Sequence, residues 1–479
     1  MSFTSLLYLL FLLVTWIIFA VTPKDRRIRV LLVASYIFYA VWSVPFLLLI
    51  QVTTSVDFFC ARTISRSTNT RLRKGLLTLG IVINLSVLGC FKYLNFLIDI
   101  QNSILSYFHI AFSARHLDLI LPLGISFYTF EAISYLVDVY RGSKPAPNWL
   151  KYNFYIMFFP HLVAGPIVRF NKFFPQYENG ITNPSIERIK AGLEMIVLGF
   201  AFKLIIADSA AMFSKPLFAR GEAISTVEAM MAAGAFMAEA YFDFQGYTHI
   251  ARGTALLFNI ELPVNFRNPG NATTIAEFWQ RWNITLSKWL YDYVYLPMGG
   301  GRKAVSTRIV AIFLTMVIAG IWHGAGLNFV VLGMYYGSLV AVYHAWRSLT
   351  RKLPKDVDKW RRTKPYKVGA WLLTHSALLP AAVLFHGSIK SDIPILKALV
   401  PFGHGAAVAP APVNVWAVCF AFAALFVCGY AQPLFTRAYR YSRELLPFWM
   451  KVHAVTVLLV VCVILEAHQT DPSFMYAQF

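Results

Sequence analysis

The chain has 479 residues, of which 58% are hydrophobic and only 14% are charged, with a mean hydropathy of +0.57. A soluble globular protein carries about 25% charged residues, so this composition excludes a string of soluble domains and predicts a polytopic membrane protein. The formal net charge of +20 comes from short basic clusters between apolar runs. Such clusters could bind nucleic acid or acidic lipid, but in a membrane protein they mainly mark cytoplasmic segments, so we expect no nucleic-acid partner. The clusters are residues 24–27, 62–74, 347–367 and 437–443.

The N-terminal apolar segment, Ser2–Val21, is predicted to remain in the protein as its first membrane span. Its first charged residue is Lys24, and it lacks both the basic start and the small-residue cleavage site of a signal peptide. We therefore expect its start on the extracytoplasmic side. All five cysteines lie in apolar stretches and none forms a CxxC pair, so neither a metal site nor a disulfide framework is expected.

The apolar runs predict an all-α fold, a polytopic membrane helix bundle of about 10–12 spans in a single membrane-embedded domain, residues 1–479. The long run from Ile28 to Cys60 is divided at Ser43–Pro45, because two spans return the basic clusters on either side of it to the cytoplasm. The expected spans are Leu6–Val21, Ile28–Trp42, Pro45–Cys60, Gly75–Cys90, Leu119–Val139, Ile189–Ala207, Val227–Phe244, Thr307–Trp322, Leu327–Tyr343, Val368–Phe385, Val413–Ala431 and Val452–Glu466.

One apolar segment, Phe154–Val168, is not predicted to be a simple span. Pro160 and Gly165–Pro166 interrupt it, which indicates a re-entrant segment buried in protein. We expect this segment and an amphipathic helix further along the chain to help enclose a tunnel within the bundle.

The amphipathic helix is predicted from Ile275 to about Tyr295, after the polar turn Asn265–Thr274. Thr274 is a suitable N-cap, and Glu277 three residues later would complete a capping box. The helix is expected to end before Pro297.

Three faces of this predicted helix carry different side chains. One face is aromatic and aliphatic, and the face beside it holds two i,i+4 pairs of opposite charge. Asn283 belongs to neither and falls with Trp279 and Ser287 on a third face. That face suits either the polar wall of a cavity or the exposed side of a surface helix. The apolar face is Phe278, Trp282, Leu286, Trp289 and Tyr293, and the pairs are Glu277 with Arg281 and Lys288 with Asp292.

His323 lies between two apolar runs that contain no charged residue, Ile309–Ile321 and Leu327–Val342. An imidazole is costly to hold at that depth in a bilayer, so by default it marks a functional site. The alternatives are a histidine that is hydrogen-bonded inside the bundle and one that lies in an interfacial loop. Position alone leaves these interpretations open.

Asn283 and His323, which is 40 residues further on, together resemble the Asn/His signature of the membrane-bound O-acyltransferase family. Five more motifs, spread over most of the chain, are similar to the bacterial alginate O-acetylase branch of that family. Their order along the chain identifies it as a member. The motifs are LPLGISFYTF at Leu121–Phe130, DVYRG at Asp138–Gly142, FFPHLVAGP at Phe158–Pro166, YFDFQGY at Tyr241–Tyr247 and FMYAQF at Phe474–Phe479.

Three positions depart from that branch. Position 283 is commonly His there, whereas this chain has Asn283. Glu131 and His249 stand where relatives often have Gln and Asp. These departures leave the acceptor and the partner open, whereas His323 itself matches the family.

The resemblance implies transfer of an acyl group from a thioester donor to a hydroxyl group inside a tunnel. An alcohol becomes a good nucleophile when a base removes its proton, and a neutral imidazole suits that task, so His323 is expected to be the general base. Asn283 would orient the acceptor or donate a hydrogen bond to the thioester carbonyl. No G-x-S-x-G motif and no cysteine near His323 is present in the sequence, so we expect no covalent enzyme intermediate.

Other polar residues are predicted, less directly, to line the tunnel. Asp243 and His249 lie on either side of Gln245–Tyr247, a sequence expected to interrupt a span. Charged residues elsewhere in apolar context are expected near membrane boundaries, where charges pair. The predicted tunnel residues are Trp322, Trp279, Ser287, Asp243 and His249, and the boundary residues are Lys92, Asp138, Lys203 and Asp208.

The first functional interpretation is an acetyltransferase of the bacterial inner membrane that helps to O-acetylate an exported polysaccharide. The resemblance implies acetyl-CoA as cytoplasmic co-substrate, no bound cofactor, and contact with membrane lipid. It also implies two kinds of protein partner, namely a periplasmic hydrolase-like O-acetyltransferase and polysaccharide synthesis and export proteins. A second interpretation changes the acceptor to a lipid, a protein or teichoic acid. A third, a transporter or proton-relay channel, predicts charged residues in several spans, and the runs beside His323 have none.

Overall fold

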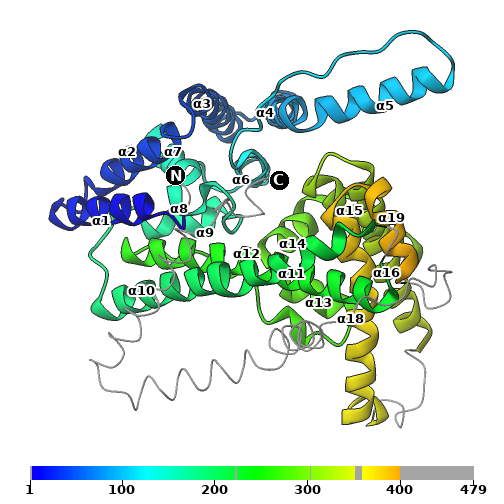
Figure 1. The fold of residues 1–479 in the computed structure, drawn as a ribbon. Coiled ribbons are helices and arrows are strands. Elements are labelled where there is room, and N and C mark those ends of the chain that lie inside the picture. The colour runs from blue at the N-terminus through cyan, green and yellow to red at the C-terminus, as the bar shows by residue number, and fades with distance from the viewer. Residues whose placement is uncertain (1–2, 222–223, 302–303, 351–358, 400–479) are drawn as a thin grey trace, which may run out of the picture. The chain divides into compact units, whose positions relative to one another are not determined.

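The computed structural model describes residues 3–221, 224–301, 304–350 and 359–399, and every regular element among them is a helix (Figure 1). The predicted all-α fold is confirmed. Two expected spans, Val413–Ala431 and Val452–Glu466, and the aromatic end Phe474–Phe479 lie outside the described residues.

The helices belong to two compact units. Of the described residues, one unit comprises residues 3–199 and 247–263, and the other comprises residues 200–246 and 264–399. The long helix α12, Thr226–Leu257, contributes its first part to the second unit and its last part to the first. The expectation of a single membrane-embedded domain stays a prediction.

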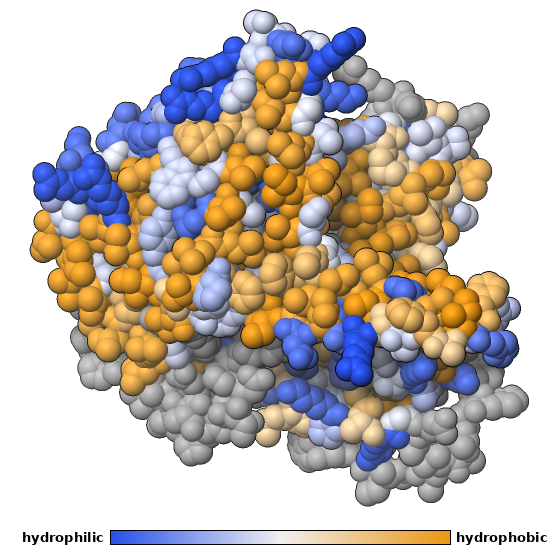
Figure 2. Space-filling view, turned by 90° about the horizontal axis from the view of Figure 1, so that it is seen from above, coloured by the Kyte–Doolittle hydropathy of each residue, from blue (hydrophilic) through white to orange (hydrophobic). Residues whose placement is uncertain are grey.

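Six helical stretches of the described chain are long and apolar enough to cross a bilayer, which supports a multi-pass membrane protein. Hydrophobic side chains cover much of the surface seen in Figure 2, as expected of helices that face lipid acyl chains. The total of about 10–12 spans stays a prediction. The six stretches are Val44–Arg66, Thr70–Tyr107, Ile186–Phe218, Val305–His323, Leu327–Leu349 and Lys364–His386, and Leu6–Val21 is apolar but shorter.

Helices of the first unit begin and end close to their expected positions, with local signals at their ends. Pro45 lies in the first turn of α3, which confirms the division of the long N-terminal run. Asn69 caps α4, because its side chain accepts the N–H groups of Arg71 and Leu72 at 3.0 and 3.2 Å. The helices are α1 (Leu6–Val21), α2 (Arg27–Ala40), α3 (Val44–Arg66), α4 (Thr70–Leu88), the π-helix η1 (Gly89–Tyr93), α5 (Leu94–Tyr107), α6 (Ile125–Tyr140), α7 (Trp149–Met157), α8 (Phe159–Leu162), α9 (Phe170–Phe173), η2 (Phe174–Gln176) and α10 (Ile186–Phe200).

α6 begins at Ile125 rather than at the expected Leu119. Gly124, directly before it, has left-handed backbone geometry (φ 74°), which glycine adopts without steric cost. A Cβ at this position would also overlap the backbone carbonyl of Leu162. Gly124 therefore lets the start of α6 touch the end of α8.

The interrupted segment Phe154–Val168 is buried along its whole length, as predicted. α8 has Pro160 in its first turn, and the chain after Leu162 continues without helix. Non-helical backbone in such a protein needs polar partners. One is Tyr247, whose hydroxyl accepts the N–H of Ala164 at 3.1 Å.

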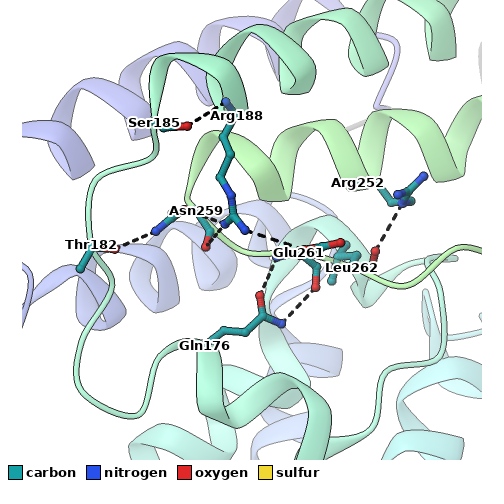
Figure 3. Close-up of polar contacts among 8 residues, drawn as sticks. All are labelled: Gln176, Thr182, Ser185, Arg188, Arg252, Asn259, Glu261 and Leu262. Atoms are coloured by element: carbon teal, nitrogen blue, oxygen red, sulfur yellow. Dashed lines mark hydrogen bonds and ion pairs between the residues drawn. The ribbon is translucent and has the colours of Figure 1, made fainter.

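Hydrogen bonds hold the loop before α10 against the end of α12 (Figure 3). The side chain of Gln176 pairs with the backbone carbonyl and N–H of Glu261 at 3.1 and 2.7 Å. Asn259 accepts from Arg188 at 2.7 Å and donates to Thr182 at 2.8 Å. Asn259 has a left-handed φ of 59°, which asparagine tolerates better than most residues. These bonds fix the place where α12 ends.

α12 runs without interruption through Gln245–Tyr247, so the expected break at this sequence is wrong. A glycine inside a helix costs only about 1 kcal/mol relative to alanine. The side chains on either side of Gly246 are buried, and their packing outweighs that cost. The span expected to end at Phe244 continues to Leu257.

The second unit contains the helices that carry the predicted site. Its first helices continue α10 beyond the expected end at Ala207, through a π-helical turn, as far as Phe218. The helices are η3 (Ala201–Ala207), α11 (Asp208–Phe218), η5 (Pro269–Asn271), α13 (Ile275–Arg281), α14 (Ile284–Leu290), η6 (Tyr291–Tyr295), α15 (Val305–His323), α16 (Leu327–Leu349), α18 (Lys364–His386) and α19 (Ile389–Ala398).

α15 and α16 pack with their backbones in contact at glycines. A Cβ at Gly333 would lie 2.7 Å from both the carbonyl oxygen of Met316 and the Cα of Val317. One at Gly320 would overlap the carbonyl oxygen of Phe329. Small residues at a helix crossing permit this approach in membranes, where close packing drives association.

We predict that Gly333→Ala destabilises the protein, because the added methyl group must push α15 and α16 apart. The expected loss of unfolding free energy is about 1–3 kcal/mol. It should appear as a lower midpoint of thermal unfolding in detergent, followed by tryptophan fluorescence. Gly75→Ala in α4 is the matched control, since no atom lies within 4 Å of a Cβ there. Equal midpoints for the two variants would contradict the backbone contact.

Candidate active site

His323 is the last residue of α15 and is buried, with 6% of its surface exposed. Its ring lies 5.0 Å from the Trp322 ring and 5.1 Å from the Phe385 ring, both in edge-to-face geometry. The chain turns directly after it at Gly324, where a Cβ would overlap the ring of Phe329. The turn therefore holds the imidazole among aromatic rings at the end of a span.

Asn283 breaks the predicted amphipathic helix, so the expectation of one helix from Ile275 to Tyr295 is wrong. α13 ends at Arg281, and Asn283 has left-handed backbone geometry, φ 38° and ψ 57°, before α14 begins at Ile284. The helical-wheel placement of Asn283 with Trp279 and Ser287 does not apply across this break. Asn283 is also only 2% exposed, which excludes the exposed side of a surface helix.

Asn265 holds the break in place, a role that no sequence pattern predicted. Its backbone carbonyl accepts the N–H of Ile284 at 2.9 Å, and its side-chain oxygen accepts the hydroxyl of Thr285 at 2.5 Å. These two bonds supply partners for the first polar groups of α14. The polar sequence Asn265–Thr274 predicted a turn at this position but not the contact of Asn265 with the start of α14.

Three buried donors near the break lack a hydrogen-bond partner among the residues that the structure describes. They are the side-chain nitrogens Nδ2 of Asn283, Nδ2 of Asn265 and Nε1 of Trp279. Leaving a buried donor unpaired costs roughly 1–3 kcal/mol. A bound molecule with acceptor oxygens at these positions would remove the cost, so the three donors indicate a ligand site.

Thr274 caps α13 as predicted, since its hydroxyl accepts the N–H of Glu277 at 3.1 Å. The return bond differs from the predicted capping box, because the Glu277 carboxylate accepts the N–H of Thr273, at 2.9 Å, rather than that of Thr274. Arg281 donates to the same carboxylate at 2.8 Å, which confirms that pair. Burial raises the pKa of Glu277, but the hydrogen bonds and Arg281 lower it more, so the pKa lies below its ordinary value. The predicted pair of Lys288 with Asp292 stays a prediction.

A cavity of about 600 Å³ lies between the broken helix, α15 and α16. Trp279 and Ser287, both predicted tunnel residues, line it. Its wall also includes Leu286, one helical turn after Asn283, and Ala319, one turn before His323. The cavity thus reaches within one turn of both main candidates. The other lining residues are Thr274, Ala276, Glu277, Gln280, Leu290, Tyr291, Tyr295, Ile312, Thr315, Met316, Val340, Tyr343, His344 and Arg347.

A second cavity of about 560 Å³ adjoins the first and is strongly basic. The two share Tyr295, Ile312, His344 and Arg347 in their walls. Arg308 near the start of α15, Arg347 near the end of α16 and Arg361 just before α18 line the second cavity. The basic cluster at residues 347–367 was predicted only to mark the cytoplasmic side, and its convergence with Arg308 on one cavity follows from the fold. The two cavities are therefore neighbours, and we call the basic one the mouth and the largely apolar one the interior.

Asp243, a predicted tunnel residue, is buried in an ion-pair cluster. The ammonium group of Lys203 lies 2.8 Å from the Asp243 carboxylate and 2.9 Å from that of Asp208. The cluster pairs Lys203 and Asp208, two of the predicted boundary residues, and gives the Asp243 carboxylate a partner of opposite charge. His249 lies further along α12 and is partly buried. A tunnel role for Asp243 and His249 stays a prediction.

Glu131, a position where the sequence departs from the alginate branch, pairs with another motif residue in the first unit. Its carboxylate lies 3.2 Å from Nδ1 of His161 and accepts the N–H of Val168 at 2.9 Å. Both side chains are almost fully buried. The pair ties α6 to the interrupted segment.

No group of three or more His, Cys, Asp or Glu side chains within the described ranges is placed to hold a metal ion. Cys60 and Cys90 are free thiols. The site is therefore defined by His323, by the unpaired donors at the helix break and by the two cavities.

These features define a multi-pass helical membrane protein in which a largely apolar cavity, next to a basic one, comes within one helical turn of a buried histidine. Residues 143–377 match the MBOAT model, which describes the membrane-bound O-acyltransferase family. The probable alginate O-acetylase AlgI of Pseudomonas putida is 36% identical over 395 residues, which cover 82% of this chain and 80% of that protein. The chain belongs to the membrane-bound O-acyltransferase family, and the protein is an O-acyltransferase.

Two further relatives are named for different acceptors. The peptidoglycan O-acetyltransferase of Helicobacter pylori is 35% identical over 397 residues, covering 77% of this chain and 73% of that protein. The teichoic acid D-alanyltransferase of Bacillus subtilis is 27% identical over 285 residues, covering 56% and 67%. Similar chains thus serve different acceptors.

We predict that Asn283→Gly leaves the unfolding midpoint nearly unchanged, whereas Asn283→Ala lowers it. The left-handed backbone costs a residue such as alanine roughly 1–2 kcal/mol, and glycine adopts it freely. Thermal unfolding in detergent measures both variants. Because both remove the same amide, an equal loss in the two would show that backbone geometry is not what the position requires.

Proposed function

We propose that the protein takes an acetyl group from acetyl-CoA at the cytoplasmic face of the bacterial inner membrane and passes it across for O-acetylation of an exported polysaccharide. The observation that carries the proposal is the pair of adjoining cavities, one basic and one largely apolar, of which the apolar one comes within one turn of His323 and Asn283. The relatives named for alginate and peptidoglycan O-acetylation support a polymer as the final acceptor.

The charge of the mouth suits a donor that carries phosphate groups. Arg308, Arg347 and Arg361 present planar guanidinium groups, which bind phosphate oxygens in pairs. The thin pantetheine arm of coenzyme A would then enter the apolar cavity. Along α15, Arg308 and His323 are separated by about 22 Å at roughly 1.5 Å per residue. The thioester end is thereby carried away from the mouth and toward the histidine.

The basic residues at the ends of α15 and α16 support a cytoplasmic position for the mouth. Basic residues of short loops lie on the cytoplasmic side of a membrane protein, and Arg308, Arg347 and Arg361 lie at the mouth end of these helices. His323 is at the opposite end of α15. The donor therefore enters from the cytoplasm, and the acceptor approaches from the other side.

The reaction balances with His323 as the general base. Its imidazole removes the proton of the acceptor hydroxyl while the oxygen attacks the thioester carbon. The Nδ2 group of Asn283 donates a hydrogen bond to the carbonyl oxygen, on which negative charge develops. When the carbon–sulfur bond breaks, the thiolate takes the proton from His323, so the histidine is neutral again. No residue of the chain becomes acylated.

Partner proteins would carry the acetyl group from this protein to the polysaccharide. A periplasmic hydrolase-like O-acetyltransferase would receive the acetyl group and act with the polysaccharide synthesis and export proteins. The relative named as a teichoic acid D-alanyltransferase supports a second candidate, in which the acceptor is a teichoic acid, a lipid or a protein. Membership of the family favours this enzyme over a transporter or proton-relay channel.

We expect His323→Ala to abolish acetylation of the secreted polysaccharide at a normal level of membrane protein. Loss of a general base lowers the rate by roughly 10²–10⁴-fold. Acetyl content is measured in the variant, the wild type and a deletion strain, with His375→Ala as a control because His375 lies in another apolar helix and bonds a backbone carbonyl. An unchanged polymer in the deletion strain would refute the polysaccharide acceptor. Full activity of His323→Ala beside an inactive deletion strain would refute the mechanism.

We expect Arg347→Ala to raise the KM for acetyl-CoA about tenfold, because a hydrogen bond to a charged group contributes roughly 1.5 kcal/mol. The turnover number should change little, since Arg347 lies at the mouth, far from the reacting carbon. Acetyl-pantetheine, which lacks the nucleotide phosphates, is the matched control substrate. Its KM should be the same in the variant and the wild type, and a parallel rise for both donors would contradict phosphate binding at the mouth.

A further inference from the structure

One element of the first unit buries almost none of its side chains against the rest of the described chain. It consists of α5 and the extended segment from Phe108 to Pro122, and we call it the arm. No residue of α5 is buried, although half of its sequence is aliphatic or aromatic. In Figure 1 α5 runs away from α4, and the extended segment returns beside it. The arm therefore exposes apolar side chains that something outside the described chain covers.

The extended segment is fastened to one side of α5 by a ladder of side-chain bonds. Asn95 exchanges two hydrogen bonds with the backbone of Leu117, at 2.9 and 3.0 Å. Asn102, seven residues later, does the same with Ala114, at 2.9 and 2.8 Å. Between them Asp99 pairs with His116 at 2.7 Å. These bonds hold α5 and the extended segment in a fixed orientation relative to each other.

The ladder covers the polar side of α5 and leaves the apolar side open. At 3.6 residues per turn, Asn95, Asp99 and Asn102 fall within an arc of about 60°. An aliphatic and aromatic arc of about 100° lies across the helix from them. Three of its members are strongly exposed, Leu97 at 55%, Ile104 at 52% and Tyr107 at 79%. The full apolar arc is Phe96, Leu97, Ile100, Ile104 and Tyr107.

The two sides of the arm require different surroundings. The Asp99–His116 pair is more than half exposed, and Arg115 and Asp118 are exposed beside it, so this side belongs in water. The opposite side would expose a continuous apolar strip to water if nothing covered it. A helix with these two sides is suited to the boundary between lipid and water.

The length and the bend of the helix agree with this position. The continuous helical stretch Thr70–Tyr107 is about 57 Å long at roughly 1.5 Å per residue, nearly twice the thickness of a bilayer core. The π-helix η1 separates α4 from α5, and Figure 1 shows the two helices running in different directions. In the stretch Thr70–Tyr107, only 11% of the most apolar part is buried, against 28–44% in the other five candidate spans. Lipid therefore already faces most of this stretch.

The positive-inside rule places the arm on the extracytoplasmic side. The turn between α3 and α4 is flanked by Arg62, Arg66, Arg71, Arg73 and Lys74, which assigns it to the cytoplasm. α4 is long enough to cross the bilayer from there. α5 begins at the other end of α4.

We infer that the arm lies in the extracytoplasmic membrane surface, with the apolar arc of α5 in the lipid and the ladder toward water. The lipid surface is the occupant because α5 belongs to the helical stretch Thr70–Tyr107, whose most apolar part is only 11% buried and so already faces lipid. Exposed aromatic residues at the tip, Phe108 at 65% and Phe112 at 59%, add apolar area at the depth of the headgroups. The inference does not depend on the acyl-transfer reaction.

A matched pair of spin labels tests the orientation. Ile104→Cys and Ser106→Cys are two residues apart but point about 160° apart around α5, the first in the apolar arc and the second in the polar one. Each is labelled in lipid nanodiscs in the full chain with its five natural cysteines replaced by alanine, once cooperative thermal unfolding shows that this chain folds. Collision with oxygen and with a water-soluble nickel chelate is then measured.

We expect several-fold more oxygen collision at position 104 and several-fold more nickel collision at position 106. Equal nickel collision at both positions would place the arm in water and overturn the inference. Shielding of both positions from both reagents would show a protein cover, such as a second copy of the chain, and would overturn it too. In right-side-out vesicles, external nickel chelate should reach position 106, and access only from the cytoplasmic side would refute the assignment of sides.

A second measurement needs no substitution. The unaltered protein is reconstituted with a phospholipid that carries a photoactivatable group near the start of its acyl chain. After illumination, peptides from Leu94–Tyr107 should carry the lipid adduct, whereas the cytoplasmic turn at residues 67–69 should not. Absence of the adduct from α5 would overturn the inference even if the cysteine-free chain did not fold.

Discussion

The backbone contact between α15 and α16 is the constraint on which the site depends. Gly320 and Gly333 leave no side chain between the two helices, so α15 cannot shift or rotate without a clash. Its last residue, His323, is therefore held at the turn into α16, against the rings of Trp322 and Phe385. The other side of α15 forms part of the wall of both cavities. One packing contact thus positions the histidine and the route that leads toward it.

Most buried charges of the two units are matched, and the exceptions are informative. Lys203 lies between two carboxylates, and Glu131 pairs with His161. An unmatched charge in such surroundings would cost several kcal/mol. The amides of Asn283 and Asn265 break this pattern, because each keeps a buried nitrogen without a partner within the described residues. Other buried polar atoms of the described residues also lack a partner, but these two amides lie together at a helix break beside a cavity, where a ligand with acceptor oxygens would satisfy them.

The arrangement separates the recognition of the donor from the chemistry. Charge is concentrated at the mouth, where water and counter-ions are at hand, and the interior of the cavity is largely apolar. A low-polarity interior strengthens each hydrogen bond made to a developing oxyanion and keeps water from the thioester. Strong binding of phosphate groups at the mouth can then position a reacting carbon about 22 Å away without a charged residue beside it.

Sequence by itself determined the features that depend on short-range signals. Composition excluded a soluble protein, Pro45 divided the long N-terminal run, Thr274 capped α13, and two prolines marked the buried segment Phe154–Val168. Each of these depends on residues a few positions apart. His323 was singled out by the apolar runs beside it and then, together with Asn283, by a family resemblance, and neither signal carries geometry.

Tertiary structure alone decided the break at Asn283, the continuity of α12 through Gly246 and the basic mouth. No glycine or proline marks the break in the sequence. The break is stabilised instead by Asn265, 18 residues before Asn283, through its bonds to Ile284 and Thr285. Packing keeps α12 helical against the weak preference of Gly246. Arg308, Arg347 and Arg361 come from separate parts of the chain, and hydrophobic periodicity reports which face of a helix is buried but not which other helix it meets. The cavities form where these helices pack against one another. The sequence therefore contains their lining residues but does not show that they lie together.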